Sequence, residues 1–193
     1  MILPGEFVLQ WVAENEDDPS DAGLLRFARF TLDDVKMPEA DRTFLIEAGL
    51  PESAAPFLNF ERPVAGPLPT LSKHADLPEA FRRYRVIGFD GGGDFICIDQ
   101  DQGGAAVIIN HDDDNHPTFI NSSIPQLAES LLVYQRLVRR TIQANGEDAF
   151  MDNNIPDDLR RWFAREMQRV DGVALADGGF WKSELISLET PYI

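Results

Sequence analysis

Four short β-rich runs, each following closely on the last, constrain the fold of this chain most strongly. They are Tyr84 to Phe89, Asp94 to Asp99, Ala105 to Asn110 and Pro117 to Asn121. Gly- and Asp-rich segments separate them, as is typical of turns. Connections this short join antiparallel strands, because a parallel crossover needs roughly a dozen residues or more. The pattern therefore predicts an antiparallel meander of about four strands.

Helical signals flank this meander on both sides. A helix is predicted over 39–48, where Pro38 stands at the start and Gly49 is placed to end it. After the last strand, Ser123 and Gln126 form a Ser-x-x-Gln capping box ahead of a long amphipathic segment. Two further segments, from about Asn154 to Val170 and from Phe180 to Leu188, complete the chain.

Residues 51–80 contain six prolines and are predicted to be irregular chain on the surface. The length and apolar content suit one domain. We expect a single α+β domain over residues 1–193, with a central antiparallel or mixed β-sheet flanked by helices.

Charge is distributed unevenly along the sequence. The chain has 33 acidic and 17 basic side chains, a formal net charge of −16. Between Val86 and Gln135 there are eight acids and no Lys or Arg, so half of the net charge lies on about a quarter of the chain. Such a field repels phosphate backbones and anionic lipid, which disfavours nucleic-acid and membrane partners, and it attracts basic proteins. Charged turns also keep a sheet soluble, so solubility is the competing explanation.

Other motifs point less clearly to chemistry. The string His111 to His116 holds two His and three Asp, residue types that can bind a divalent metal, but all of them lie in one hairpin loop. Asp99 to Gly104 begins like a calcium loop but departs from that pattern at its fifth and twelfth positions. Gly91 to Gly93 lacks the following helix of a phosphate-binding loop and is predicted to be a hairpin turn.

The single cysteine and the first residues indicate the compartment. Cys97 lies within a predicted strand, so we expect a buried, inert thiol that forms no internal disulfide. No secretory signal pattern precedes Gly5. We expect a cytoplasmic protein with no cofactor.

The chain resembles the SUKH superfamily, and most of all its fourth branch of immunity proteins. The resemblance rests on Arg83 to Asp99, on Ala106 to Asn110, and on Phe119 to Ser123 leading into the following helix. The turn Gly49-Leu50-Pro51 and the late pair Phe180-Trp181 are also similar, and the resemblance spans roughly residues 30–190. It implies a bacterial protein with a central sheet and packed helices that neutralises a toxin domain, often a nuclease, delivered by another cell.

The charge pattern and this resemblance agree on a binding protein with no catalytic residues. Rim charges govern association rate, and an acidic surface suits a basic toxin. The predicted partner-binding residues are the acids of the hairpin turns: Asp112, Asp113, Asp114, Asp90, Asp94, Asp99 and Asp101.

Two other functions remain open at this point. One is a metal-dependent hydrolase that uses His111, His116 and the carboxylates between them. The other is a regulatory scaffold with a housekeeping partner, which would share the same fold and surface.

Overall fold

The fold combines six helices with two antiparallel sheets. The computed structural model of the chain describes residues 1–16, 23–63 and 65–189. Within these ranges the helices are α1 (Pro4–Glu14), α2 (Glu39–Glu47), α3 (Leu71–His74), α4 (Ile124–Asn145), α5 (Asp157–Asp171) and α6 (Phe180–Glu189). The strands are β1 (Leu24–Leu25), β2 (Leu50–Pro51), β3 (Ser53–Ala54), β4 (Leu58–Phe60), β5 (Tyr84–Asp90), β6 (Phe95–Asp99), β7 (Ala105–Asn110) and β8 (His116–Asn121). Short 3₁₀ turns are η1 (Arg29–Thr31), η2 (Glu79–Arg83), η3 (Gln100–Gln102) and η4 (Gly172–Leu175).

The main sheet has six strands in the order β3-β4-β5-β6-β7-β8, and every neighbouring pair is antiparallel. Its last four strands are the predicted meander, which confirms the α+β class and the antiparallel connections. The predicted number of about four strands is too low, because β3 and β4 extend the sheet at one edge. A separate two-stranded sheet pairs β1 with β2.

The two additional strands lie in the segment that the sequence predicts to be irregular. Within β4, Leu58 and Phe60 are buried and Asn59 between them is half-buried, which is the alternation of a strand with one face on a core. β4 pairs with β5 through Leu58–Asp90 and Phe60–Gly88. Pro56 stands in the turn before β4, where it removes no ladder hydrogen bond. The many prolines of this segment therefore indicated irregular chain, and its two strands are too short to show a pattern of their own.

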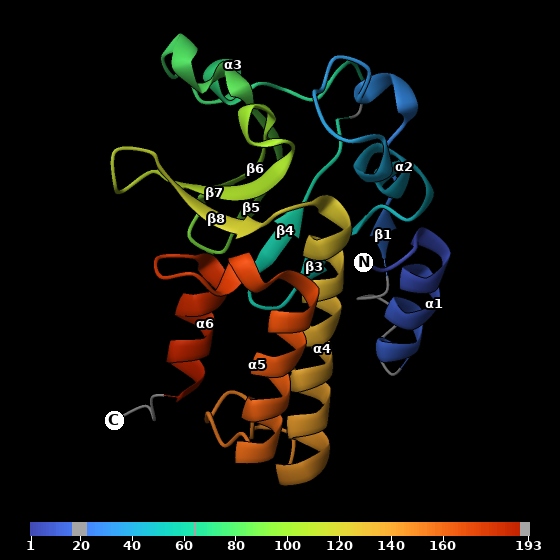
Figure 1. Cartoon of the computed structure of the whole chain (residues 1–193), viewed down its shortest axis with the longest axis vertical. Helices are drawn as coiled ribbons and strands as arrows, with labels where there is room; N and C mark the ends of the chain where they lie inside the picture. Colours follow the sequence, from blue (N-terminus) through green and yellow to red (C-terminus); the bar gives the residue numbers. More distant parts are fainter. Residues whose placement is uncertain (17–22, 64, 190–193) are drawn as a thin grey trace.

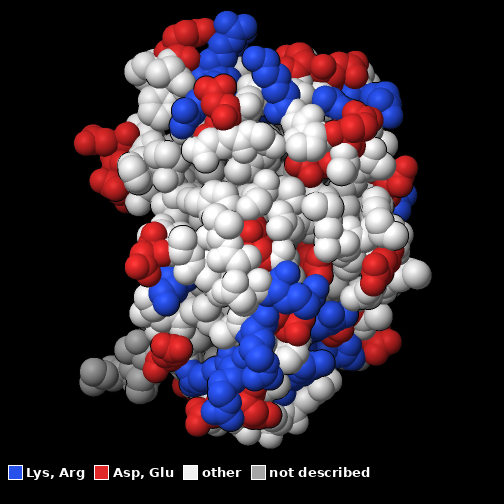
Figure 2. All heavy atoms as spheres, in the orientation of Figure 1, with Lys and Arg blue, Asp and Glu red and all other residues white. Residues whose placement is uncertain are grey.

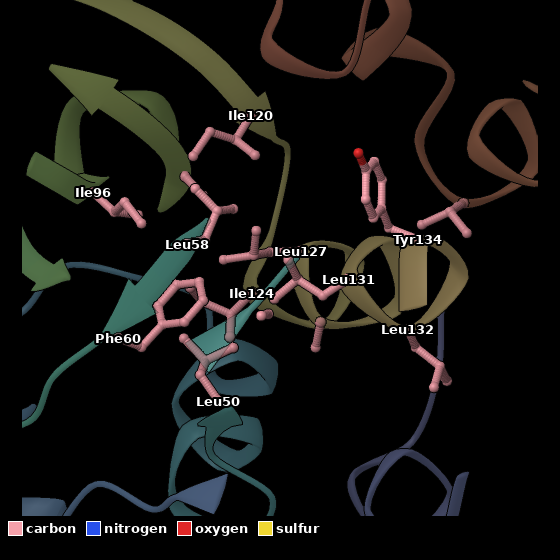
Figure 3. Packing of buried hydrophobic residues seen from close by; sticks show 14 of the residues in the cluster. Leu50, Leu58, Phe60, Ile96, Ile120, Ile124, Leu127, Leu131, Leu132 and Tyr134 are labelled. Atoms are coloured by element: carbon pink, nitrogen blue, oxygen red, sulfur yellow. The ribbon is translucent and has the colours of Figure 1, made fainter. Parts of the chain in front are cut away.

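The first turns of α4 pack against one face of the sheet, the rest of α4 extends away from it, and α5 and α6 pack beside α4 (Figure 1). In the core between them, Leu58, Phe60 and Ile120 meet Leu127 and Leu131 of α4 (Figure 3). The opposite face of the sheet carries a smaller cluster of buried side chains: Leu71, Tyr84, Val86, Cys97, Val107 and Ile109. Cys97 is buried as predicted, and this burial raises the pKa of its thiol well above the ordinary value.

The predicted helix-end signals are present. The Ser123 hydroxyl donates to Gln126 Oε1 at 2.7 Å and accepts from the Gln126 backbone N–H at 3.4 Å. At the end of α2, Gly49 has φ +79°, and a β-carbon there would lie 2.2 Å from the Leu25 carbonyl oxygen. Only glycine fits this turn without moving β1. The apolar segment near the N-terminus forms α1, which buries Phe7 and Trp11.

A buried polar network joins the end of the sheet to three helices. Asn121, the last residue of β8, donates through Nδ2 to Ser130 Oγ at 3.1 Å and to Asp171 Oδ2 at 3.2 Å. Its Oδ1 accepts from the Trp181 indole N–H at 2.8 Å. Asp171 also accepts from the backbone N–H of Ser122 at 2.7 Å and from its hydroxyl at 3.0 Å. Removing Asn121 would leave the Trp181 N–H as an unsatisfied polar group in the core.

We predict that Asn121→Ala lowers the free energy of unfolding by roughly 2 to 4 kcal/mol, because it strands the Trp181 N–H in the core and removes one hydrogen bond each from Ser130 Oγ and Asp171 Oδ2. Urea denaturation followed by tryptophan fluorescence measures this. Gln102→Ala, a truncation in an exposed turn, is the control and is expected to change stability by less than about 0.5 kcal/mol. A loss of less than about 1 kcal/mol in Asn121→Ala would contradict the role given to the network.

Candidate protein-binding surface

The meander places the seven predicted acids at two opposite ends of the sheet. Successive turns of a meander alternate between its ends, so the β5–β6 and β7–β8 turns share one end and the β6–β7 turn lies at the other. We call the first pair the acidic turns, and their carboxylates are Asp90, Asp94, Asp112, Asp113 and Asp114.

In the β5–β6 turn, Asp90 has a structural role. Its Oδ1 accepts from the backbone N–H groups of Gly92 and Asp94, both at 2.9 Å. Gly93 has φ +88°, which suits glycine and closes the turn. Asp90 therefore fixes the conformation of the loop that positions Asp94.

His111 connects the two acidic turns. Its backbone N–H donates to Asp94 Oδ1 at 2.8 Å, and its ring Nδ1 lies 2.6 Å from the same oxygen. On its other side, Nε2 lies 3.4 Å from Asp112 Oδ1. The hydrogen bond with Asp94, and then the charge of Asp112, raise the pKa of His111 above its ordinary value. This histidine is the cation that bridges the two turns at low pH.

The β7–β8 turn carries the most exposed carboxylates. Asp112, Asp113 and Asp114 all lie on the surface, and the side chain of Asp112 is 88% exposed. Asp114 and Asn115 have φ of 49° and 58°, the left-handed conformation that Asp and Asn tolerate well. The hairpin projects at the left of Figure 1, and red atoms gather at the same place in Figure 2.

Asp99 and Asp101 lie at the other end of the sheet. Asp99 is fully buried, its Oδ1 accepts from the Asp101 N–H at 3.0 Å, and its Oδ2 lies 3.4 Å from Arg83. Asp101 is exposed and 4.0 Å from the same guanidinium. The structure therefore does not group these two residues with the acidic turns, and Asp99 presents no surface to a partner.

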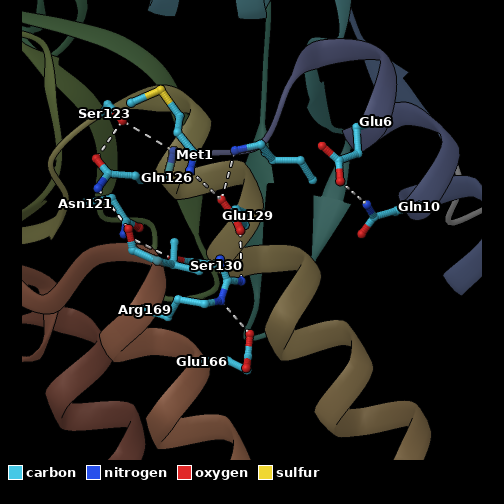
Figure 4. Close-up of polar contacts among 12 residues, drawn as sticks. Met1, Glu6, Gln10, Asn121, Ser123, Gln126, Glu129, Ser130, Glu166 and Arg169 are labelled. Atoms are coloured by element: carbon cyan, nitrogen blue, oxygen red, sulfur yellow. Dashed lines mark hydrogen bonds and ion pairs between the residues drawn. The ribbon is translucent and has the colours of Figure 1, made fainter.

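The eighth acid of the cation-free span, Glu129, is also internal. It lies on α4 and pairs with Arg169 of α5 at 2.9 Å, while its second oxygen accepts from the Ile2 N–H at 3.0 Å (Figure 4). Arg169 also binds Glu166 at 2.9 Å. This carboxylate joins the segment before α1 to α4 and α5, and because it is largely buried and paired it contributes little to the outer field.

The metal-site alternative finds no support in the geometry. Among the residues described, no three His, Cys, Asp or Glu side chains are placed so as to hold a metal ion. His111 is engaged by Asp94 and Asp112, and His116 begins the next strand opposite Asn110. The carboxylates between the two histidines point into solvent instead of converging.

The cations of the chain gather elsewhere. Blue atoms cover the surface of α4 and α5 in the lower part of Figure 2. Arg161 and Arg165 of α5 are exposed, and Arg140 stacks on Trp162 with its guanidinium carbon 4.3 Å from the ring centre. On this face the arginine-rich surface of α4 and α5 thus lies apart from the projecting β7–β8 hairpin, although acidic atoms are also present among the basic ones (Figure 2).

Sequence reasoning missed two exposed apolar residues, one of which, Phe57, lies beside the β5–β6 turn. Phe57 and Met151 are each 73% exposed. Phe57 also has φ 63°, a conformation that costs a bulky residue roughly 1 to 3 kcal/mol. The Pro56-Phe57 pair signals a turn in the sequence, but neither the exposure nor the strain can be inferred from it.

Comparison with known proteins identifies the class. A family model of immunity proteins matches residues 4–187. The chain therefore belongs to the SUKH-4 immunity protein family, which confirms the resemblance drawn from its motifs. Searches of curated proteins and of solved structures gave no match. Among the described residues, no helix has the length and apolar character needed to cross a membrane.

The bridge between the acidic turns predicts a specific titration. Because the pKa of His111 is raised on folding, its protonated form stabilises the turns at low pH, and this contribution is lost as the pH rises through the folded pKa. We expect Asp94→Asn to lower the pKa of His111 toward 6.5, as measured by NMR titration of the imidazole.

The matched control is Asp101→Asn, which removes the same charge at the far end of the sheet and should leave the His111 titration unchanged. Equal His111 pKa values in the wild type and in Asp94→Asn would show that the bridge does not exist in solution.

Proposed function

We propose that this chain is an immunity protein that binds a cognate toxin domain directly and blocks it through the acidic turns. The observation that carries the proposal is the gathering of five carboxylates on two adjacent turns, with His111 as the cation between them. Membership in an immunity protein family supports a toxin as the partner. The protein acts in the cytoplasm, as a binding module and not as an enzyme.

The charge of the surface indicates the kind of toxin. A nuclease active site holds phosphates and is therefore rich in Lys and Arg. A projecting loop with three exposed carboxylates is complementary to such a site and accelerates encounter with it. We propose a toxin with a basic surface, and a nuclease as the favoured activity.

The partner to test can be identified from gene order. We expect a neighbouring gene to encode a large secreted protein whose variable C-terminal domain is the toxin. That domain, made with an inactivating substitution, is the probe for all binding measurements below.

Replacing Asp112, Asp113 and Asp114 together by Asn should lower the association rate constant about tenfold or more at low salt, because the steering field is removed. The difference should shrink at physiological ionic strength, where screening acts over about 8 Å. Surface plasmon resonance or stopped-flow fluorescence at two salt concentrations measures both rates.

A variant with the same charge change outside the acidic turns is the control: Glu47→Gln, Glu61→Gln and Glu147→Gln together. These three side chains are exposed and should affect association much less. If the wild type binds and the triple Asn variant binds with the same rate constants, the acidic turns are not the binding surface.

A further inference from the structure

A hollow of about 330 Å³ lies among the β3–β4 turn, α4, the loop between α4 and α5, and α6. Phe57 and Met151, each 73% exposed, both line it. Its other lining residues are Pro56, Tyr134, Phe150, Asn153, Glu184, Ser187 and Leu188. Aromatic and methionine side chains around a concave site are what apolar anchors of a partner fill.

The hollow adjoins the acidic turns through the backbone. Phe57 directly precedes β4, whose first residue, Leu58, pairs with Asp90. A β-carbon placed on Gly91 would lie 3.1 Å from the β-carbon of Phe57, so the β3–β4 turn contacts the β5–β6 turn. A partner that covers the acidic turns therefore also reaches the rim of this hollow.

The hollow contains a carboxylate suited to a cation. Glu184 Oε2 accepts from the Tyr134 hydroxyl at 3.2 Å, and no Lys, Arg or His in the described part of the chain forms an ion pair with it. Its partial burial raises its pKa, because desolvation disfavours the ionised form more than the Tyr134 hydrogen bond favours it. A Lys or Arg from a partner would supply the missing charge.

The backbone conformation that keeps Phe57 exposed is energetically unfavourable. The left-handed φ of 63° is unfavourable for an aromatic residue, and the exposed ring gains little from burial. Strained conformations of this kind concentrate at functional sites. Covering the ring with a partner would recover the burial that folding does not provide.

We propose that this hollow is the affinity anchor for the toxin: it receives an apolar side chain between Phe57 and Met151, with an adjacent Lys or Arg on Glu184. The inference rests on the proposed function and adds a second component to it. The acidic turns set the association rate, and the hollow sets the dissociation rate.

Binding kinetics of the full-length protein with the inactivated toxin domain test this. Phe57→Gly and Met151→Ala should each raise the dissociation rate constant at least about tenfold and change the association rate constant less than about twofold. Phe30→Ala and Leu9→Ala are the controls, since they truncate exposed apolar residues outside the hollow and should change neither rate.

The variants are chosen so that folding does not confuse the result. Glycine accepts a φ of 63° freely, so Phe57→Gly should not lower the melting temperature. Glu184→Gln keeps the size and the acceptor for Tyr134 but removes the charge, and it should raise the dissociation rate severalfold. If the truncations unfold the protein, Glu184→Gln alone tests whether the hollow anchors the toxin.

The outcomes separate the two proposals. If the wild type does not bind the toxin domain, the proposed function fails. If the wild type binds and all three variants dissociate at the wild-type rate, the anchor is elsewhere and this inference is overturned. It is also overturned if sedimentation shows a wild-type dimer that Phe57→Gly dissociates while toxin binding is unchanged, since the hollow would then join two copies of this chain.

Discussion

The amide of Asn121 fixes how the sheet sits on the helices. It satisfies Ser130 of α4, Asp171 of α5 and Trp181 of α6 with one planar group, at the point where β8 ends. Because these partners are buried, a shift of the sheet would leave several polar groups without hydrogen bonds. The positions of the acidic turns and of the β3–β4 turn relative to α4 and α6 follow from this constraint. The late Phe180-Trp181 pair seen in the sequence thus has a structural reason.

The parts of the fold that were predicted are those where local chemistry decides. Short polar turns required antiparallel strands, and Ser123, Gln126 and Gly49 marked helix ends through their own hydrogen bonds and backbone preferences. The strands β3 and β4 were missed because β4 is held by pairing with β5, β3 by pairing with β4, and both by burial in the core, which no local pattern records. Whether such short strands form is decided by tertiary contacts.

For the candidate site, the sequence placed the acids in turns, because local chemistry decides where turns form. A meander alternates its turns, so the seven acids had to divide between two ends, and Asp99 continues the face of β6 that carries the buried Cys97. Exposure of Phe57 and Met151 depends on chain segments distant in sequence and was beyond sequence reasoning. Charge and apolar surface also serve different purposes here. Exposed carboxylates attract a basic partner over long distances, whereas the apolar area of the hollow contributes only when a partner is in contact with it and buries it.

Hydrogen–deuterium exchange with and without the toxin domain shows whether the acidic turns and the adjoining hollow together form the toxin-binding face. We expect slower exchange at 90–94, 111–116, 55–58 and 150–153, with little change on the arginine-rich surface of α5. Protection confined to α5, with unchanged exchange in both acidic turns, would contradict it.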